Sequence, residues 1–299
     1  MLNYMESDMH SGFSFDKVVI IQSLGGADIL TGDILSKYIP HICEEKGFTI
    51  PVELINCESG SQFLQIIHEL VTEASNGTIP LLHVECHGDP NSGLDFKDGS
   101  DLSWQQISDA LLSLNVATRF NLMAIFSACF GFYFVERMGA IDRAPCWCLV
   151  APTSVVYEDE IMGAFRDFYR DLFLTNSVSM AFRSLSKWKL RHGRWICTVA
   201  EDWFEKLIVG YIERHCTIHS SDKRIKRYYR YAKSKGLRWS RGYIKRLFSK
   251  RNRYHILNKY FNKYFLIQDI PENSSRFSSV HVRINKRLAD LRSTRKYYI

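Results

Sequence analysis

Two side chains in the first half of the sequence have the types and positions that thiol chemistry requires. His87 follows the apolar run 79–86, and Cys129 follows a second apolar run, 122–126, by a Ser-Ala step. A thiolate with an imidazole base beside it is a nucleophile for a carbonyl carbon. The 42 residues between the two positions leave room for a helix that crosses from one parallel strand to the next. We therefore expect His87 and Cys129 to meet at one edge of a sheet.

Each of these residues alone is more often structural. A cysteine in an apolar run is commonly buried and inert, and a histidine after a strand is commonly a packed or hydrogen-bonded side chain. The helical pattern of 131–138 predicts a helix N-terminus aimed at Cys129, which would favour the thiolate. Gly88 would let the backbone approach a substrate carbonyl closely. It is the combination that favours a nucleophile with its base.

Strand-like and helix-like patterns alternate over the first 220 residues, which predicts an α/β fold with a mostly parallel sheet and helices on both faces. A hairpin is expected around 94–96, and Ser103 is expected to cap the helix after it. Ligands and catalytic groups gather beyond the carboxyl ends of such strands, which is where His87 and Cys129 fall. The predicted strands are 18–23, 50–55, 79–86, 122–126 and 146–151, and the predicted helices are 32–46, 61–74, 104–114, 131–138 and 159–188, the last broken near 175–176.

The strings HVECHGD (83–89), LMAIFSACFG (122–131) and GLDFKDGSDLSWQQI (93–107) resemble the caspase-like cysteine peptidases, most closely the prokaryotic CHAT branch. The resemblance covers about residues 16–190. It implies a caspase-like fold and an endopeptidase that acts on protein or peptide substrates without a metal or cofactor. It further implies a catalytic dyad of His87 and Cys129, with the backbone amides of Gly88 and Cys129 as the oxyanion hole. Relatives of this kind are often controlled by partner proteins or nucleic-acid-sensing complexes, including immune and cell-death systems.

The same resemblance implies where the side chain before the scissile bond would bind. The corresponding places hold Asp28, Ser127, and Glu158 or Asp159. Carboxylates there would pair with Arg or Lys of a substrate. The alternative, weighted equally, is that they are ordinary solvated surface acids. A second alternative concerns the whole domain: a caspase-like scaffold or binding module that has lost turnover.

Charge divides the chain into two regions. The net charge is +7, yet residues 222–299 hold 23 Lys/Arg and 4 Asp/Glu, a net of +19, which leaves −12 for 1–221. We therefore expect a peptidase domain over 1–220 and a basic, aromatic-rich, mainly helical extension over 221–299, with helices at 222–235 and 240–265 and a short strand at 280–284. The first residues lack a secretory pattern, no apolar run is long enough to span a membrane, and the eight cysteines show no CxxC pairs. These features predict a cytoplasmic protein with reduced thiols.

The partner of the basic extension stays open at this level. Its interleaved cationic and aromatic residues suit nucleic acid, with Trp239 or tyrosines available to stack on bases. They suit an acidic protein surface equally well, including the acidic first domain of the same chain. An anionic membrane surface, or simple solvation of a helical pair, fits less well.

Overall fold

The computed structural model describes residues 13–136, 141–175 and 177–299, and it divides the chain into two compact units. The first unit runs to residue 200, and the second comprises 201–299 together with the described residues 141–143. The boundary falls at the start of helix α7 (Ala200–His215), so the boundary expected at 220 lies inside the next helix, α8 (Ile218–Ser234).

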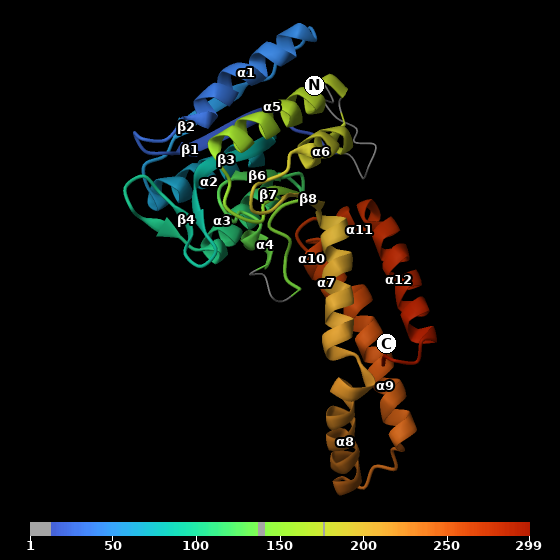
Figure 1. Ribbon diagram of the computed structural model, residues 1–299. Helices are drawn as coiled ribbons and strands as arrows, with labels where there is room; N and C mark the ends of the chain where they lie inside the picture. Colours follow the sequence, from blue (N-terminus) through green and yellow to red (C-terminus); the bar gives the residue numbers. More distant parts are fainter. Residues whose placement is uncertain (1–12, 137–140, 176) are drawn as a thin grey trace. The chain divides into compact units, whose positions relative to one another are not determined.

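The first unit is built around one mixed sheet (Figure 1). In spatial order its main strands are β2 (Val52–Asn56), β1 (Lys17–Ser23), β3 (Pro80–Asp89), β6 (Met123–Ser127), β7 (Cys148–Pro152) and β8 (Trp195–Val199). The first five run parallel, and β8 runs antiparallel to β7. The central strands are apolar and buried on both faces, as parallel strands covered by helices must be. The prediction of an α/β fold with a mostly parallel sheet is confirmed, whereas β8 was not predicted.

Helices cover both faces of this sheet. On one face, His83 of β3 contacts Tyr169 of α5 (Glu158–Thr175), and α1 (Thr31–Glu45) packs beside α5. On the other face, Phe126 of β6 meets Trp104 of α3 (Trp104–Ala117), and α2 (Gly60–Ser75) packs beside α3. The remaining helices of this unit are α4 (Tyr133–Glu136) and α6 (Val178–Lys187). The predicted cap is confirmed, because the Ser103 hydroxyl accepts from the Gln106 amide in a capping box.

Strand β3 is longer than its neighbours and belongs to two pairings. Residues up to Cys86 pair within the main sheet, and His87 to Asp89 pair with β4 (Gly93–Asp95), which pairs in turn with β5 (Asp101–Leu102). The expected hairpin is therefore present. His87 lies at the point where β3 leaves the sheet, and this point sets the direction of its side chain.

The second unit is helical throughout its described residues. Besides α7 and α8, it contains α9 (Arg241–Tyr254), a π-helical turn (His255–Tyr260), α10 (Phe261–Tyr264), α11 (Asn273–Arg276) and α12 (Ser278–Ser293). Aromatic contacts join these helices into a core: the Phe265 ring stacks on Phe277 and meets Phe204 edge-on. The C-terminal residues fasten α8 and α9 to it, since the Tyr298 amide donates to the Cys216 carbonyl and Asn252 donates to the Tyr298 carbonyl.

The strand predicted at 280–284 is wrong, because these residues belong to α12. Val280 and Ile284 are buried, whereas Val282 is 66% exposed. The apolar positions that matter are therefore four residues apart, a helical spacing that the alternating letters VHVRI concealed. Within the described residues, no helix combines the length and the apolar character that crossing a bilayer demands.

Candidate active site

Strand register brings His87 and Cys129 to the same edge of the sheet. The last paired residues of the parallel strands β3 and β6 are Glu85 and Ser127. His87 and Cys129 follow these partners by two positions each, which brings both to the same edge of the sheet. Both residues line one pocket of about 180 Å³.

Gly88 allows the two strand ends to approach each other. A Cβ atom built at Gly88 would lie 2.3 Å from the carbonyl oxygen of Cys129 and 3.4 Å from the Ala128 side chain. Real Cβ atoms do not come so near to an oxygen atom. Only glycine therefore fits where the backbones of residues 88 and 129 run together, and these two residues carry the amides expected to bind an oxyanion.

Cys129 lies in a turn rather than at the start of a helix. The helix that follows, α4, begins at Tyr133, so the helix expected from residue 131 does not direct its first turn at the sulfur. A helix dipole acts within about the first turn, and it therefore gives no account of thiol activation here. The backbone after the cysteine is strained instead, because Phe130 has a φ of 59°.

Hydrogen bonds hold this strained turn in place. The Phe130 amide donates to the Ser154 carbonyl at 3.0 Å, and the Phe132 amide donates to the Pro152 carbonyl at 3.0 Å. The Val156 amide donates to Cys129 Sγ at 3.5 Å. The segment after β7 thus fixes both the turn and its sulfur, so the position of the thiol depends on three neighbouring strand ends.

Asp28 binds His87, a contact that the sequence did not reveal. Its Oδ2 atom lies 3.1 Å from His87 Nε2 and accepts from the Gly25 amide at 2.7 Å. Burial acts to raise the pKa of Asp28, but the Gly25 and His87 contacts outweigh it and the pKa is lowered. An ionised carboxylate thus orients the imidazole at neutral pH. Asp28 lines the pocket as expected, although its carboxylate is engaged with the histidine.

The acidic residues at the start of α5 have different surroundings. Glu158 lines the pocket. Asp159 pairs with the Arg191 guanidinium at 2.7 Å and is absent from the described pocket lining. Glu160 is buried and accepts from the amides of Tyr157 and Arg191. Of the two expected positions, the structure brings only Glu158 to the site.

Ser127 lines the pocket as expected and has an unsatisfied hydroxyl. The residue is 3% exposed, and its Oγ has no hydrogen-bond partner among the described residues. A buried hydroxyl without a partner costs free energy, and such groups are rare unless a ligand or water completes them. The side chain therefore offers a free donor and acceptor inside the pocket.

Glu85 is the pocket residue that sequence reasoning missed. It is 1% exposed, and its carboxylate accepts from the Thr31 hydroxyl at 2.7 Å and contacts His83 Nε2 at 2.9 Å. His83 Nδ1 contacts the Tyr169 hydroxyl at 2.8 Å, so the ring links Glu85 to Tyr169. Burial and the Glu85 carboxylate raise the pKa of Tyr169, which stays protonated. The available signal was strand alternation, because Glu85 shares a face with His87.

The remaining cysteines lie outside the pocket except for Cys86, which also lines it but is only 4% exposed. Burial raises the pKa of Cys43 and Cys146 to about 12 and that of Cys57 and Cys216 to about 11. Burial likewise raises the pKa of Cys86 and Cys197, and Cys148 is fully buried. Cys129 is the partly exposed thiol that lines the pocket with His87.

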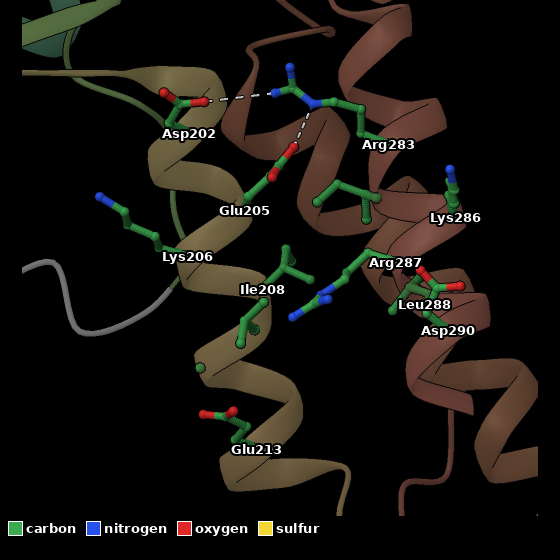
Figure 2. Close-up of a pocket in the computed structure, with 13 residues that line it drawn as sticks. Asp202, Glu205, Lys206, Ile208, Glu213, Arg283, Lys286, Arg287, Leu288 and Asp290 are labelled. Atoms are coloured by element: carbon green, nitrogen blue, oxygen red, sulfur yellow. Dashed lines mark hydrogen bonds and ion pairs between the residues drawn. The ribbon is translucent and has the colours of Figure 1, made fainter. Parts of the chain in front are cut away.

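A larger hollow of about 800 Å³ lies in the second unit, between α7 and α12 (Figure 2). Figure 2 shows Arg283 of α12 directed at α7, where its Nε donates to Glu205 at 2.6 Å and its guanidinium lies 3.9 Å from Asp202. Ile208 and Leu288 line the hollow below the contacts of Arg283. The lining residues, all of them described, include no thiol, imidazole or hydroxyl, so the hollow has no nucleophile and base to match the pocket of the first unit.

No protein-family model matches the chain, and no curated protein sequence matches it.

Proposed function

We propose that the first unit is a caspase-like cysteine endopeptidase in which Cys129 is the nucleophile and His87 the base. The observation that carries this proposal is the convergence of both side chains on one pocket at the carboxyl ends of adjacent parallel strands. The His-Gly pair ends β3 and the Ala-Cys pair follows β6, the arrangement that the resemblance to the CHAT branch implies. A nucleophile, a base and an orienting third group form the usual constellation of nucleophilic catalysis.

In this proposal each group has a role. Asp28 holds His87 Nε2, which leaves Nδ1 to accept the proton of the Cys129 thiol. The thiolate attacks the substrate carbonyl carbon, and the amides of Gly88 and Cys129 receive the negative charge that develops on its oxygen. The C–N bond breaks as the imidazolium returns its proton to the amine, which leaves a thioester on Cys129. Water then hydrolyses the thioester, releases the acid and restores the thiol.

The pocket beside the thiol supports a preference for Arg or Lys before the scissile bond. Glu158 supplies a carboxylate, and Ser127 supplies a buried hydroxyl that lacks a partner among the described residues. Because Asp28 is engaged with His87, it acts in this proposal as a positioning residue rather than as the acid that receives the substrate. A cationic side chain in the pocket would gain a charge-assisted hydrogen bond there.

A panel of fluorogenic peptides that differ in the residue before the scissile bond tests the proposal. Arg and Lys peptides should be cleaved faster than Asp peptides, and Cys129→Ala should lower kcat by about 10⁴-fold or more. Cys197→Ala, which alters the other partly exposed thiol, should cleave as the wild type does. Undiminished cleavage by Cys129→Ala would overturn the proposal, and a complete lack of turnover on protein substrates would favour an inactive scaffold.

Two neighbouring acids provide a matched test of specificity. Glu158→Gln should reduce the advantage of Arg over uncharged peptides by about tenfold, which corresponds to the loss of one charge-assisted contact. Asp159→Asn should leave it unchanged, because Asp159 pairs with Arg191 outside the pocket lining. Equal effects of both substitutions would show that the preference reflects general negative charge.

The second unit belongs to the same proposal as a regulatory region. Its net positive charge supports control of the peptidase through a bound partner, which is the kind of control that the resemblance to the CHAT branch implies. Cleavage measured with and without added polyanions tests this, and a rate that stays constant would argue against it.

A further inference from the structure

The most strongly charged surface of the chain is a helical hairpin that the proposed chemistry does not use. It comprises α8, the turn 235–240 and α9, and we call residues 218–254 the basic hairpin (Figure 1). This segment contains 14 Lys/Arg and one acidic residue, Asp222. Eleven of the 14 cations are exposed. Among the described residues, the one ion pair within the hairpin joins Lys226 to Asp222 at 2.7 Å.

The two helices of the basic hairpin share a small buried apolar core. Ile225 of α8 packs against Ile244 and Phe248 of α9, with Tyr229 and Tyr298 at the margin. The exposed aliphatic side chains are Ile218 in α8, Leu237 in the turn and Leu247 in α9. No single helix therefore presents the continuous aliphatic face that an interfacial helix requires. The surface is also more densely charged than the core of a protein interface, where charged residues as a class are depleted even though Arg is enriched.

Aromatic rings lie exposed among the cations. Tyr231 and Tyr254 are 57% and 62% exposed, and Trp239 and Tyr243 are 36% and 39% exposed. The rings of Trp239 and Tyr243 lie 5.6 Å apart at the turn between the helices, beside the exposed side chains of Lys235 and Arg238. Rings and cations that alternate along an open surface can stack on bases and neutralise phosphates at the same time.

We propose that the basic hairpin binds single-stranded nucleic acid, with Lys and Arg on phosphates and the Trp239–Tyr243 pair as a stacking platform for bases. The density of unpaired positive charge favours a polyanion as the ligand. The exposed rings favour a polyanion with planar groups, such as the bases of nucleic acid. The inference concerns a surface distinct from the Cys129 pocket, and it stands or falls independently of peptidase activity.

The test measures fluorescence anisotropy of labelled single-stranded RNA and DNA oligonucleotides with the full chain. Binding should weaken steeply between about 50 and 200 mM salt, with a log–log slope of about −0.7 for each phosphate contacted. Trp239→Ala should raise Kd about tenfold with little change in slope, since stacking releases no counterions. Trp239→Phe should restore most of the affinity, and melting temperatures should confirm that both variants are folded.

A charge-matched pair provides the control. Lys235→Gln with Arg238→Gln should reduce the slope by about 1.4. Arg287→Gln with Arg292→Gln removes the same charge from exposed positions on α12 and should leave the slope unchanged. Three results would each overturn the proposal. The two double variants could lose the same amount of slope, or Trp239→Ala could bind as tightly as the wild type. The third is that polyglutamate or anionic vesicles bind as tightly as the oligonucleotides.

Discussion

The edge of the sheet in the first unit and the basic hairpin of the second unit represent two ways of building a binding surface. At the edge of the sheet, single atoms are placed by backbone pairing: His87 and Cys129 follow the partnered residues Glu85 and Ser127, and Gly88 allows the strand ends to touch. In the basic hairpin, 14 cations are spread over two exposed helices, and few of them have a fixed partner.

The two regions should therefore differ in how well they tolerate a substitution. Groups that act as a unit give losses that do not add, because removing one member disables the others. Phosphate contacts on an open surface act nearly independently, so each contributes a small and similar share. We therefore expect large single-residue effects at the edge of the sheet and small additive ones in the basic hairpin.

Among substitutions that leave His87 and Cys129 in place, the largest effect is expected for Gly88→Ala. The added Cβ would meet the Cys129 carbonyl oxygen at 2.3 Å, so the strand ends must separate and the Gly88 amide must move. Displacing one oxyanion donor costs roughly 10²–10³-fold in kcat, and overpacking adds about 1–3 kcal/mol of destabilisation. Peptide cleavage and urea denaturation measure the two losses.

Gly210 provides the control for this substitution. A Cβ at Gly210 in α7 would have no neighbour within 4 Å. Gly210→Ala should stabilise the helix by about 1 kcal/mol and leave cleavage unchanged. If Gly88→Ala also cleaves at the wild-type rate, backbone contact at the edge of the sheet does not control the chemistry.

The next largest effect is expected for Glu85→Gln, which breaks a buried network. The substitution places an amide between His83 Nε2 and Thr31, and one of these contacts is lost together with the charge. A buried hydrogen-bonding group left without its partner costs about 1–3 kcal/mol of unfolding free energy. Glu53→Gln is the matched surface change, and it should cost less than about 1 kcal/mol because Lys17 keeps Glu73. Similar costs for both would contradict a special role for the buried network.

The sequence predicted those parts of the site that depend on local pattern. His87 and Cys129 stand at the ends of apolar runs, and in a parallel sheet such ends share an edge. The Ser103 cap and the hairpin were likewise readable from local residue types. Glu85 was within reach of the same reasoning, because alternation along β3 puts it on the face of His87.

Other features depend on tertiary structure. Asp28 lies in the loop after β1 and contacts His87. The path of a loop cannot be predicted from hydrophobic periodicity, so the sequence did not reveal this contact. β8 is a short strand after Gly193 that pairs antiparallel with β7. Its position depends on the unpaired edge of β7, which local sequence pattern does not reveal. In α12 the alternation of apolar and polar residues at 280–284 is typical of a strand. In the structure these residues are helical, because the side chains buried in the second unit are four residues apart.

Asp28→Asn should have a moderate effect that identifies a positioning residue. A general base contributes roughly 10²–10⁴-fold, and we expect a loss of about tenfold in kcat with little change in KM when His87 loses its orienting carboxylate. Asp33→Asn removes an acid that pairs with exposed Lys37 and should leave kcat unchanged. A change confined to KM would assign Asp28 to substrate binding instead.

The pH dependence of stability checks the same contact. Because the pKa of Asp28 is lowered on folding, the stability it contributes is present above about pH 4 and is lost as pH falls through the folded pKa. His87 is largely exposed, so the contribution is below about 1 kcal/mol. Urea denaturation of the wild type and Asp28→Asn should therefore differ slightly at neutral pH and converge in acid.

The smallest effects are expected for single cations of the basic hairpin. Lys233→Gln and Lys250→Gln alter exposed residues on different helices, and each should reduce the salt slope of oligonucleotide binding by about 0.7. In the double variant the salt slope should fall by about 1.4, because the contributions of independent phosphate contacts add. A single lysine that removed most of the affinity, or a double variant much worse than the sum, would mean that the hairpin holds its ligand in a defined site. The distinction from the edge of the sheet would then fail, because both surfaces would depend on individually placed groups.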